Sequence, residues 1–206
     1  KGAGMLLYPA QVAEVLALIA EYPEIQFSLK MRLGWENASE CMVLVELLNT
    51  LRLSRIALHA RTGKQQYKGH PDLEAFQGFY ELCQHPLYYN GDIESLSDIR
   101  QILTRFPLLK GVFIGRGLLS SPLLAKEFKG NETFLPEQRM SIYFAFHEEL
   151  FSAYSQVLQG ETQLLVKMKT LWEYFLPETD RKLLKRIKKS TRLQQYTESV
   201  KAIFTS

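Results

Sequence analysis

The sequence predicts two parts of different fold class. Residues 1–127 are expected to form an α/β domain, the C-terminal half of a TIM (βα)8 barrel, and residues 128–206 a small helical bundle. In the first part, short apolar segments alternate with segments of helical periodicity, which is typical of parallel strands joined by helices. Polar residues follow each apolar segment, as they do at the functional face of a barrel. Beyond residue 128 only helical periodicity remains, which indicates an all-α domain.

The strands of the first part are short and apolar, and they are expected at residues 24–33, 55–60, 86–93 and 111–117. The helices are recognised by their 3.6-residue period and are expected at residues 9–22, 39–51, 72–83, 95–106 and 118–128. Pro9 suits the first turn of the first helix, and Asp72 is placed to cap the third. Strands that are apolar on both faces and alternate with helices predict a parallel sheet.

A parallel sheet of this kind admits two folds, a half barrel and a doubly wound sheet. In a barrel, functional groups gather at the carboxyl ends of the strands. Each of the four predicted strands ends in a polar cluster, and these clusters are Lys30 with Arg32, His59 with Arg61, Asn90 with Asp92, and Gly115 with Arg116. This repetition favours the barrel.

Four amphipathic helices are predicted in the second part, two at residues 137–158 and 162–176, a third with its apolar residues up to Ile187 and a fourth with its apolar residues up to Ile203. Pro177 is expected to end the second of these helices. Thr179 is expected to cap the third, and Thr191 to open the fourth.

The composition is that of an ordinary globular protein, with 46% apolar and 23% charged residues. Cys41 and Cys83 provide neither a disulfide framework nor a metal-binding spacing, and no apolar run is long enough to cross a bilayer. We therefore expect a cytoplasmic protein with no membrane partner and no metal site. The chain begins at Lys1 without a methionine, so it is expected to be part of a longer protein.

Lys30 and His59 stand at the ends of neighbouring predicted strands. An ammonium group and an imidazole at this position suit an electron-rich cofactor ring that accepts negative charge, such as a flavin. The alternative is structural, with the lysine paired to a carboxylate and the histidine bonded to backbone groups.

The segment GVFIGRG suits a phosphate, because glycines let backbone N–H groups approach an anion and Arg116 adds a fixed charge. A tight turn with a surface arginine is the alternative. The segment NGDI, residues 90–93, is weaker by itself, since Asn-Gly is common in turns.

The remaining histidines and cysteines carry less weight. His147 lies on the apolar stripe of a predicted helix, so a hydrogen-bonded core histidine is favoured over a ligand. Cys41 is interpreted as an inert buried thiol in preference to a reactive thiolate. We therefore expect no catalytic residue of these types in this chain.

The net charge of +3 comes entirely from residues 123–206, which hold thirteen basic and ten acidic side chains. One predicted helix carries most of the basic residues, namely Arg181, Lys182, Lys185, Arg186, Lys188 and Lys189. A solvated helix face and a nucleic-acid surface both explain such a run, and phosphate neutralisation is the function that it suits best.

Taken together, the segments KGAG, LKMRLGW, LHARTGKQQYKG, NGDI and IGRG resemble the second half of the bacterial tRNA-dihydrouridine synthases. The segment KMKTLWEYF and the basic helices after it resemble the C-terminal tRNA-binding domain of that family. The resemblance implies FMN as the cofactor, NADPH as the reductant, and transfer of hydride to C6 of a uracil in tRNA.

By motif position, the resemblance also implies roles for individual residues. Lys30 and His59 are expected at the flavin ring, and Arg32 and Tyr67 at the target uracil. The ribityl phosphate is expected in loops formed by Asn90, Gly91, Asp92, Gly115 and Arg116.

The sequence departs from the family pattern at its start. The cysteine that serves as the general acid in the family precedes the KGAG segment, and neither Cys41 nor Cys83 matches it. Four barrel strands are also absent, so we expect the isolated chain to be an inactive fragment. Open sheet edges lead to the further expectation that the half barrel self-associates or belongs to an intact longer chain.

Two other functions remain open. One is another FMN-dependent barrel reductase that acts on a small molecule, although such an enzyme has no need of the basic helical part. The other is a non-catalytic RNA-binding module.

Overall fold

The computed structural model describes residues 2–205, and the chain divides into two compact units, residues 1–114 and 115–206. This boundary lies earlier than the one expected after residue 127. The reason is that Leu123 belongs to the core of the second unit and the Ser120 carbonyl accepts a hydrogen bond from the Leu176 N–H. The separate functions of the two parts stay a prediction.

The first unit contains one sheet, formed by β1 (Phe27–Gly34), β2 (Leu53–Thr62), β3 (Leu87–Asn90) and β4 (Gly111–Phe113). Its helical elements are η1 (Gly2–Leu7), α1 (Pro9–Ala17), η2 (Leu18–Glu21), η3 (Glu40–Leu44), α2 (Val45–Thr50), α3 (Leu73–Leu82) and α4 (Leu96–Arg105). The predicted alternation of strands and helices is confirmed. The first two predicted helices each contain a 3-10 segment, η2 and η3.

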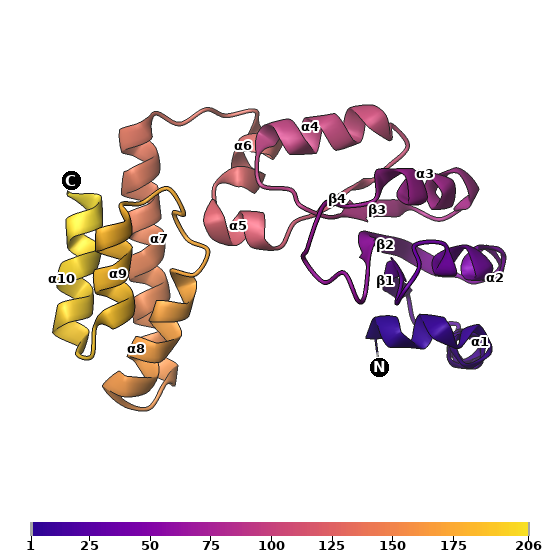
Figure 1. The fold of residues 1–206 in the computed structure, drawn as a ribbon, viewed down its shortest axis with the longest axis horizontal. Helices are drawn as coiled ribbons and strands as arrows, with labels where there is room; N and C mark the ends of the chain where they lie inside the picture. Colours follow the sequence, from indigo (N-terminus) through magenta and orange to yellow (C-terminus); the bar gives the residue numbers. More distant parts are fainter. Residues whose placement is uncertain (1, 206) are drawn as a thin grey trace. The chain divides into compact units, whose positions relative to one another are not determined.

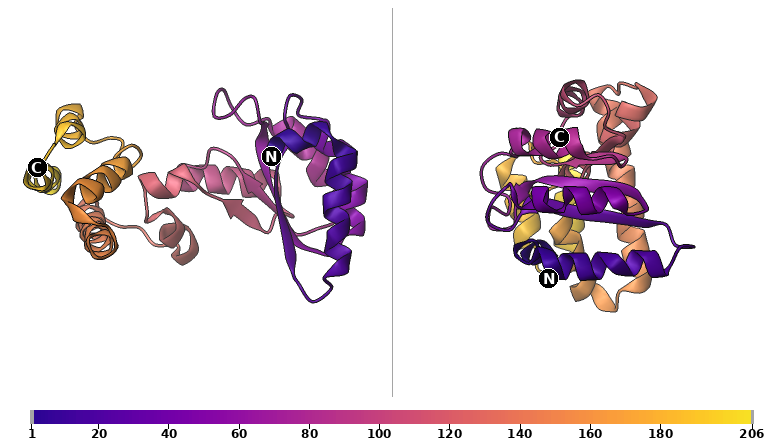
Figure 2. Two further views of the ribbon diagram at one scale, coloured as in Figure 1. Left: turned by 90° about the horizontal axis from the view of Figure 1, so that it is seen from below. Right: turned by 90° about the vertical axis from the view of Figure 1, so that its right-hand side faces the viewer.

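The four strands are parallel and lie in the order β1-β2-β3-β4, so each strand pairs with the next one along the chain. Helices α2, α3 and α4 cover one face of this sheet (Figure 1, Figure 2). A doubly wound sheet reverses its strand order at a switch point, and no reversal occurs among the described strands. The arrangement is an α/β fold consistent with part of a TIM barrel.

The two faces of the sheet differ in character because side chains alternate along each strand. The helix-covered face carries fully buried Leu33 and Leu58, and the ring of Tyr89 packs edge-on against Phe76 at 5.0 Å. Each such large apolar side chain contributes about 1.5–3 kcal/mol on burial. The opposite face carries the polar side chains on which the predicted site depends.

The starts of α3 and α4 are both set by capping side chains, of which the one at α3 was predicted from the sequence. Asp72 accepts a hydrogen bond from the Ala75 N–H at 2.9 Å, which confirms it as the cap of α3. Ser95 and Asp98 form a reciprocal capping box at the start of α4. These caps fix the residues at which the loop after β2 ends in α3 and the loop after β3 ends in α4.

The second unit is helical within its described residues, and its elements are α5 (Arg116–Ser120), α6 (Leu124–Gly130), α7 (Pro136–Val157), α8 (Gly160–Leu171), α9 (Arg181–Lys189) and α10 (Leu193–Phe204). Two sequence predictions are wrong here. α8 ends at Leu171, well before Pro177, because the turn after it buries Trp172 and Phe175 in the core. Asp180, in place of Thr179, caps α9 by accepting hydrogen bonds from the N–H groups of Lys182 and Leu183.

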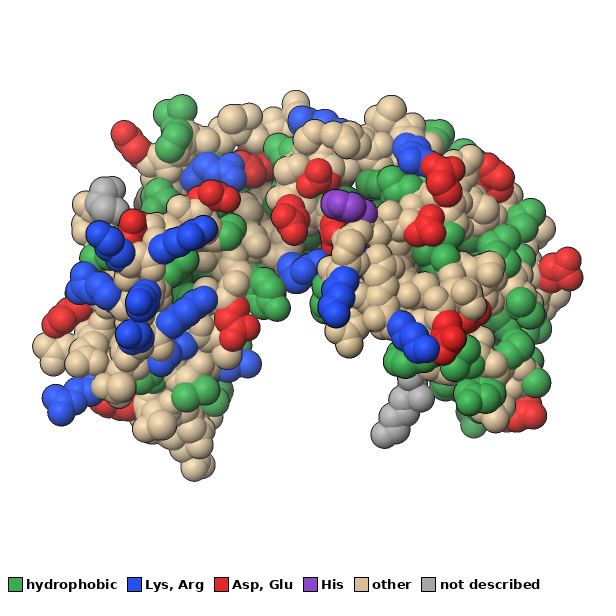
Figure 3. Space-filling model, in the orientation of Figure 1, with side chains coloured by type: hydrophobic (Ala, Val, Ile, Leu, Met, Phe, Trp, Pro, Cys, Tyr) green, Lys and Arg blue, Asp and Glu red, His purple; other side chains and the backbone are tan. Residues whose placement is uncertain are grey.

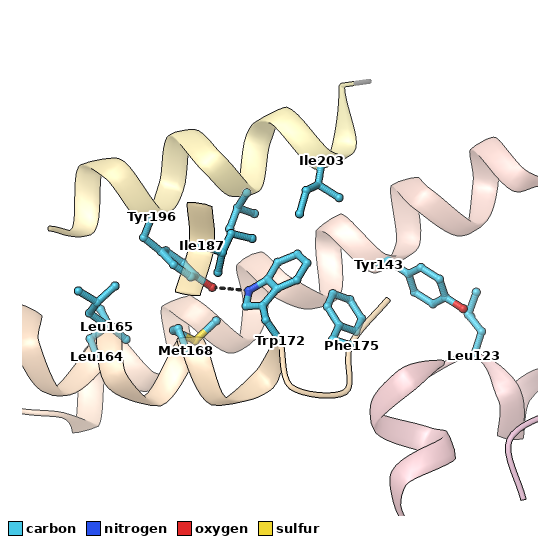
Figure 4. Packing of buried hydrophobic residues seen from close by; sticks show 11 residues of the cluster. Leu123, Tyr143, Leu164, Leu165, Met168, Trp172, Phe175, Ile187, Tyr196 and Ile203 are labelled. Carbon is cyan, nitrogen blue, oxygen red and sulfur yellow. Dashed lines mark hydrogen bonds between the residues drawn. The ribbon is translucent and has the colours of Figure 1, made fainter. Parts of the chain in front are cut away.

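The core of the second unit is rich in aromatic rings (Figure 4). Its buried members are Leu123, Tyr143, Leu164, Leu165, Met168, Trp172, Phe175, Ile187, Tyr196, Val200 and Ile203. Four helices, α7 to α10, contribute to this cluster. Across residues 2–205 no helix has the length and apolar character that crossing a membrane requires.

Candidate functional site

A row of polar side chains crosses the sheet on the face away from the helices. Arg32 on β1 pairs in register with His59 on β2, and His59 pairs with Asn90 on β3. Paired residues of parallel strands point to the same side, and Lys30, two residues before Arg32, shares that side. The sheet therefore brings together four of the predicted site residues.

His59 lies at the centre of this row and is 7% exposed. Burial first, and then the positive charges of Arg32, Lys30 and Arg61, lower the pKa of its imidazole to about 4, while Asp92 opposes this shift. The ring is therefore neutral at pH 7. Within residues 2–205 the His59 ring has no hydrogen-bond partner, so the structural alternative for this histidine, bonding to backbone groups, is not observed in the described part of the chain.

Lys30 presents its ammonium group on the same face. Its side chain is exposed, and its pKa is lowered by partial burial and by the neighbouring charge of Arg32. None of the carboxylates in residues 2–205 pairs with it. Lys30 and neutral His59 thus provide a cation and a hydrogen-bonding ring on adjacent strands.

Arg32 contacts the loop that follows β2. Its Nη1 donates hydrogen bonds to the carbonyl oxygens of Thr62, at 2.6 Å, and Gln66, at 3.3 Å. Tyr67, the other residue expected at the uracil, lies next in this loop and is largely exposed. Arg32 and Tyr67 therefore belong to one local structure, and their contact with a substrate stays a prediction.

The carboxylate of Asp92, a residue expected in a loop around the phosphate, is bound to Arg61. The two Nη atoms of Arg61 donate to Oδ1 and Oδ2 of Asp92 at 2.6 and 2.5 Å. A bidentate pair of this kind holds both groups in fixed orientation. The side chain of Asp92 is thus held in an ion pair, and the place of its loop at a phosphate stays a prediction.

The turn after β3 begins with Asn90 and Gly91. The Asn90 Nδ2 donates to the Phe113 carbonyl at 2.8 Å and so ties β3 to β4. Gly91 has φ of 154°, and a Cβ placed there would lie 2.7 Å from the Tyr89 hydroxyl oxygen. Only glycine fits this turn, because both the positive φ and the close hydroxyl group disfavour a side chain.

Gly115 and Arg116 belong to the second unit. Gly115 is the residue before α5, and Arg116 is the first residue of that helix. A Cβ at Gly115 would meet no atom within 4 Å. Their predicted role in binding a phosphate stays a prediction.

Sequence reasoning gave no role to two aromatic residues on the polar face. Tyr88 precedes Asn90 by two positions, and its ring lies 5.4 Å from the ring of Phe113 on β4. The two-residue period of a strand is the signal that places both side chains on the face of His59.

The predictions for Cys41 and His147 are confirmed. Cys41 is fully buried, and burial raises the pKa of its thiol to about 12. His147 is buried in the second unit, where its Nε2 lies 2.7 Å from the Tyr196 hydroxyl oxygen and its Nδ1 lies 3.0 Å from Glu148.

The basic residues of α9 form an exposed surface on the second unit, and Figure 3 shows lysine and arginine side chains gathered there. The residues predicted to contact a tRNA backbone are all exposed, namely Arg181, Lys182, Lys185, Arg186, Lys188 and Lys189. A groove of about 460 Å³ runs between α9 and α10. It is lined by Lys182, Lys185, Arg186, Lys189, Ser190, Gln195, Glu198 and Ser199.

Comparison with known proteins gives a consistent result. A family described as dihydrouridine synthase (Dus) matches residues 1–205. A probable tRNA-dihydrouridine synthase of Aquifex aeolicus is 35% identical over 133 residues, which cover 63% of this chain and 42% of that protein. The tRNA-dihydrouridine synthase B of Vibrio vulnificus is 26% identical over 140 residues, which cover 66% of this chain and 43% of that protein.

A third relative, the tRNA-dihydrouridine synthase B of Vibrio cholerae, is 26% identical over 144 residues, or 68% of this chain and 44% of that protein. The chain thus spans about two fifths of the length of the curated relatives that it matches.

Proposed function

The chain belongs to the dihydrouridine synthase family, and from this premise we propose that it takes part in the reduction of uridine to 5,6-dihydrouridine in tRNA. FMN is the proposed cofactor and NADPH the proposed reductant. The observation that carries the proposal is the row of Lys30, Arg32, His59 and Asn90 on one face of the parallel sheet.

The polar face fits a flavin ring by its chemistry. A flavin that receives hydride gains negative charge on one side of its ring system, and a nearby cation stabilises that charge. Lys30 is an exposed cation, and His59 is a neutral ring whose nitrogens have no partner among residues 2–205. Both groups are therefore available to a ligand.

When bound, reduced FMN supplies the hydride for the uracil ring. Lys30 holds the negative charge of the cofactor, and His59 orients the ring by hydrogen bonding. Arg32 and Tyr67 hold the target base, the first by donating to a carbonyl and the second by stacking or hydroxyl contact. The loop of Asn90, Gly91 and Asp92 is assigned to the ribityl phosphate, and so are Gly115 and Arg116.

The proton that C5 of the uracil needs is not assigned to a cysteine of this chain. Cys41 lies fully buried, and its thiol donates to the Ala38 carbonyl. Cys83 lies just after α3, outside β1 to β4, and burial also raises the pKa of its thiol. We propose that the isolated chain is inactive for this reason.

The basic surface of α9 supports tRNA over a small molecule as the substrate. Four basic side chains line the groove between α9 and α10. The phosphate backbone of a nucleic acid binds such a surface with release of counterions. We propose that Arg181, Lys182, Lys185, Arg186, Lys188 and Lys189 contact the tRNA backbone, and that the protein acts in the cytoplasm.

Self-association is proposed for the first unit because β1 and β4 are the edge strands of the described sheet. Unpaired strand edges are templates for pairing with another chain. Sedimentation at several concentrations tests this, and a monomer at all of them would contradict it.

The experiment that tests the proposed function is titration of the chain with FMN, followed by flavin fluorescence. We expect saturable binding that Lys30→Ala weakens about tenfold, equivalent to roughly 1.4 kcal/mol. The matched control is Lys110→Ala, since Lys110 is exposed and precedes β4 at the opposite end of the sheet. Equal affinity in both variants would contradict the assignment of the flavin to the polar face.

A further inference from the structure

Two arginines hold the loop of residues 62–70, which carries Tyr67. Arg32 donates to the carbonyls of Thr62 and Gln66 near the start of the loop. Arg61 donates from Nη2 to the carbonyl of Gly69 near its end, at 2.6 Å. The loop is therefore fixed at both ends by side chains from two different strands.

Arg61 also fixes the neighbouring turn. Its bidentate bonds to Asp92 reach across to the segment after β3, where Asn90 in turn bonds to the Phe113 carbonyl. One guanidinium group thus joins the loop that carries Tyr67 to the turn that begins with Asn90. Arg61 lies two positions beyond His59 on β2, and both of its Nη atoms are used in these bonds to the protein.

The surroundings of Arg61 do not suit a role in stability alone. Its side chain is fully buried, and its Nε has no hydrogen-bond partner within residues 2–205. A buried ion pair whose donors are incompletely satisfied is a poor stabilising device compared with apolar side chains of the same volume. What an arginine provides here is the fixed geometry of its fork, which neither lysine nor an apolar residue reproduces.

We propose that Arg61 is a positioning residue for the reaction, and that it aligns Tyr67 with the Asn90–Gly91–Asp92 turn by holding the loop of residues 62–70. The identity of the two ligands rests on the proposed function, with the uracil at Tyr67 and the cofactor at the turn. The alignment itself rests on the bonds of Arg61 to Asp92 and Gly69.

The first test is amide hydrogen exchange of the 206-residue chain, compared between wild type, Arg61→Lys and Asp92→Asn. We expect exchange in residues 62–70 to become at least tenfold faster in both variants. Asp92 is partly exposed, so Asp92→Asn provides a second variant if Arg61→Lys unfolds. Exchange in the loop that stays at the wild-type rate in a folded variant would overturn the proposal.

The controls alter an exposed arginine–carboxylate ion pair, which is joined through a single Nη atom. Arg105 and Glu74 lie 2.5 Å apart on the helical side of the same unit. Arg105→Lys and Glu74→Gln make the same chemical changes, and we expect both to leave exchange in residues 62–70 unchanged. A general loosening of the loop in these controls would contradict a specific role for Arg61.

The second test measures the affinity for a short uridine-containing RNA in the presence of FMN. We expect Arg61→Lys and Tyr67→Ala each to weaken binding about tenfold, and the double variant to be no weaker than either single variant. Such non-additivity is what positioning predicts, and a purely structural residue would not produce it. Fully additive losses, or unchanged affinity in Arg61→Lys, would overturn the positioning role.

A failure of the proposed function can be told apart from a failure of the positioning role of Arg61. A wild-type chain that binds neither FMN nor the RNA contradicts the proposed function. A wild-type chain that binds both, together with an Arg61→Lys variant of unchanged loop exchange and RNA affinity, contradicts only the positioning role.

Discussion

The Tyr196 hydroxyl donates a hydrogen bond to Nε2 of His147 across 2.7 Å, and so links α10 to α7. The same hydroxyl oxygen accepts a hydrogen bond from the Trp172 indole N–H at 2.9 Å (Figure 4). Because His147 Nδ1 lies 3.0 Å from the Glu148 carboxylate, that nitrogen carries the proton and Nε2 is the acceptor. The buried hydroxyl oxygen of Tyr196 thus joins α7, α10 and the turn after α8.

Removing this oxygen with Tyr196→Phe is expected to destabilise the second unit by about 2–4 kcal/mol. The substitution leaves the His147 Nε2 and the Trp172 N–H buried without a partner, and each unsatisfied group costs about 1–3 kcal/mol. Denaturant unfolding followed by tryptophan fluorescence measures the loss. The matched control is Tyr174→Phe, because Tyr174 is exposed and should change stability by less than about 0.5 kcal/mol.

The charge state of His59 provides a prediction about pH. Its pKa in the folded chain is about 4, below the usual value of 6.5, so the unfolded chain binds more protons between these values. The stability of the first unit should therefore fall as the pH is lowered from about 6.5 towards 4. A His59 Cε1–H signal that titrates near pH 6.5 in the folded chain would contradict the expected environment.

The neighbours of His59 should change that titration in a definite direction. Arg32 lowers the pKa of His59 more than Lys30 does. Replacing Arg32 with methionine therefore removes the larger of these two effects, and replacing Lys30 with methionine removes the smaller. We expect both variants to raise the pKa of His59, Arg32→Met more than Lys30→Met. The same NMR titration measures both shifts, and a decrease in either variant would refute the assigned causes.

Gly63 is expected to be indispensable to the packing of Trp35 at the end of β1. A Cβ at Gly63 would lie 2.2 Å from Cε3 of the Trp35 ring, so Gly63→Ala forces the ring or the loop to move. We expect a loss of about 1–3 kcal/mol in the stability of the first unit and a shifted Trp35 emission. Gly4→Ala is the matched control, because a Cβ there meets no atom within 4 Å and its effect should be near zero.

The basic groove predicts how tRNA affinity depends on salt. Each phosphate contact contributes about 0.7–0.9 to the slope of log K against log salt. Removing two groove charges with Lys185→Gln and Lys189→Gln should therefore reduce the slope by about 1–2. Lys110 and Lys201 are exposed lysines outside the groove, and the double control Lys110→Gln/Lys201→Gln should leave the slope nearly unchanged.

Much of the first unit could be predicted from the sequence because its signals are local. Alternating periods marked the strands, and the side chain of Asp72 marked the start of α3. The end of α8 could not be predicted in this way. A helical period continues through Phe175, but the core recruits that ring from a turn, and tertiary packing overrides the local pattern.

The candidate site was predictable in its strand residues and less so in its loops. The two-residue period places Lys30 and Arg32 on one face of β1, but the register that sets His59 beside Arg32 is known only from the folded sheet. The pairing of Arg61, on β2, with Asp92, in the turn after β3, forms only in the folded chain, and thirty-one positions separate the partners. The sequence therefore indicated Asp92 as a site residue but not which group its carboxylate binds.

The strict alternation of the two faces has a consequence for how the gene can change. Deleting or inserting one codon within β2 before His59 would rotate every later side chain of the strand by half a turn, so that the imidazole would enter the helical layer and Leu58 or Ala60 would take its place. Length variation should accordingly be tolerated in the connections between elements and rejected inside this strand, even where each new residue is acceptable by its own chemistry.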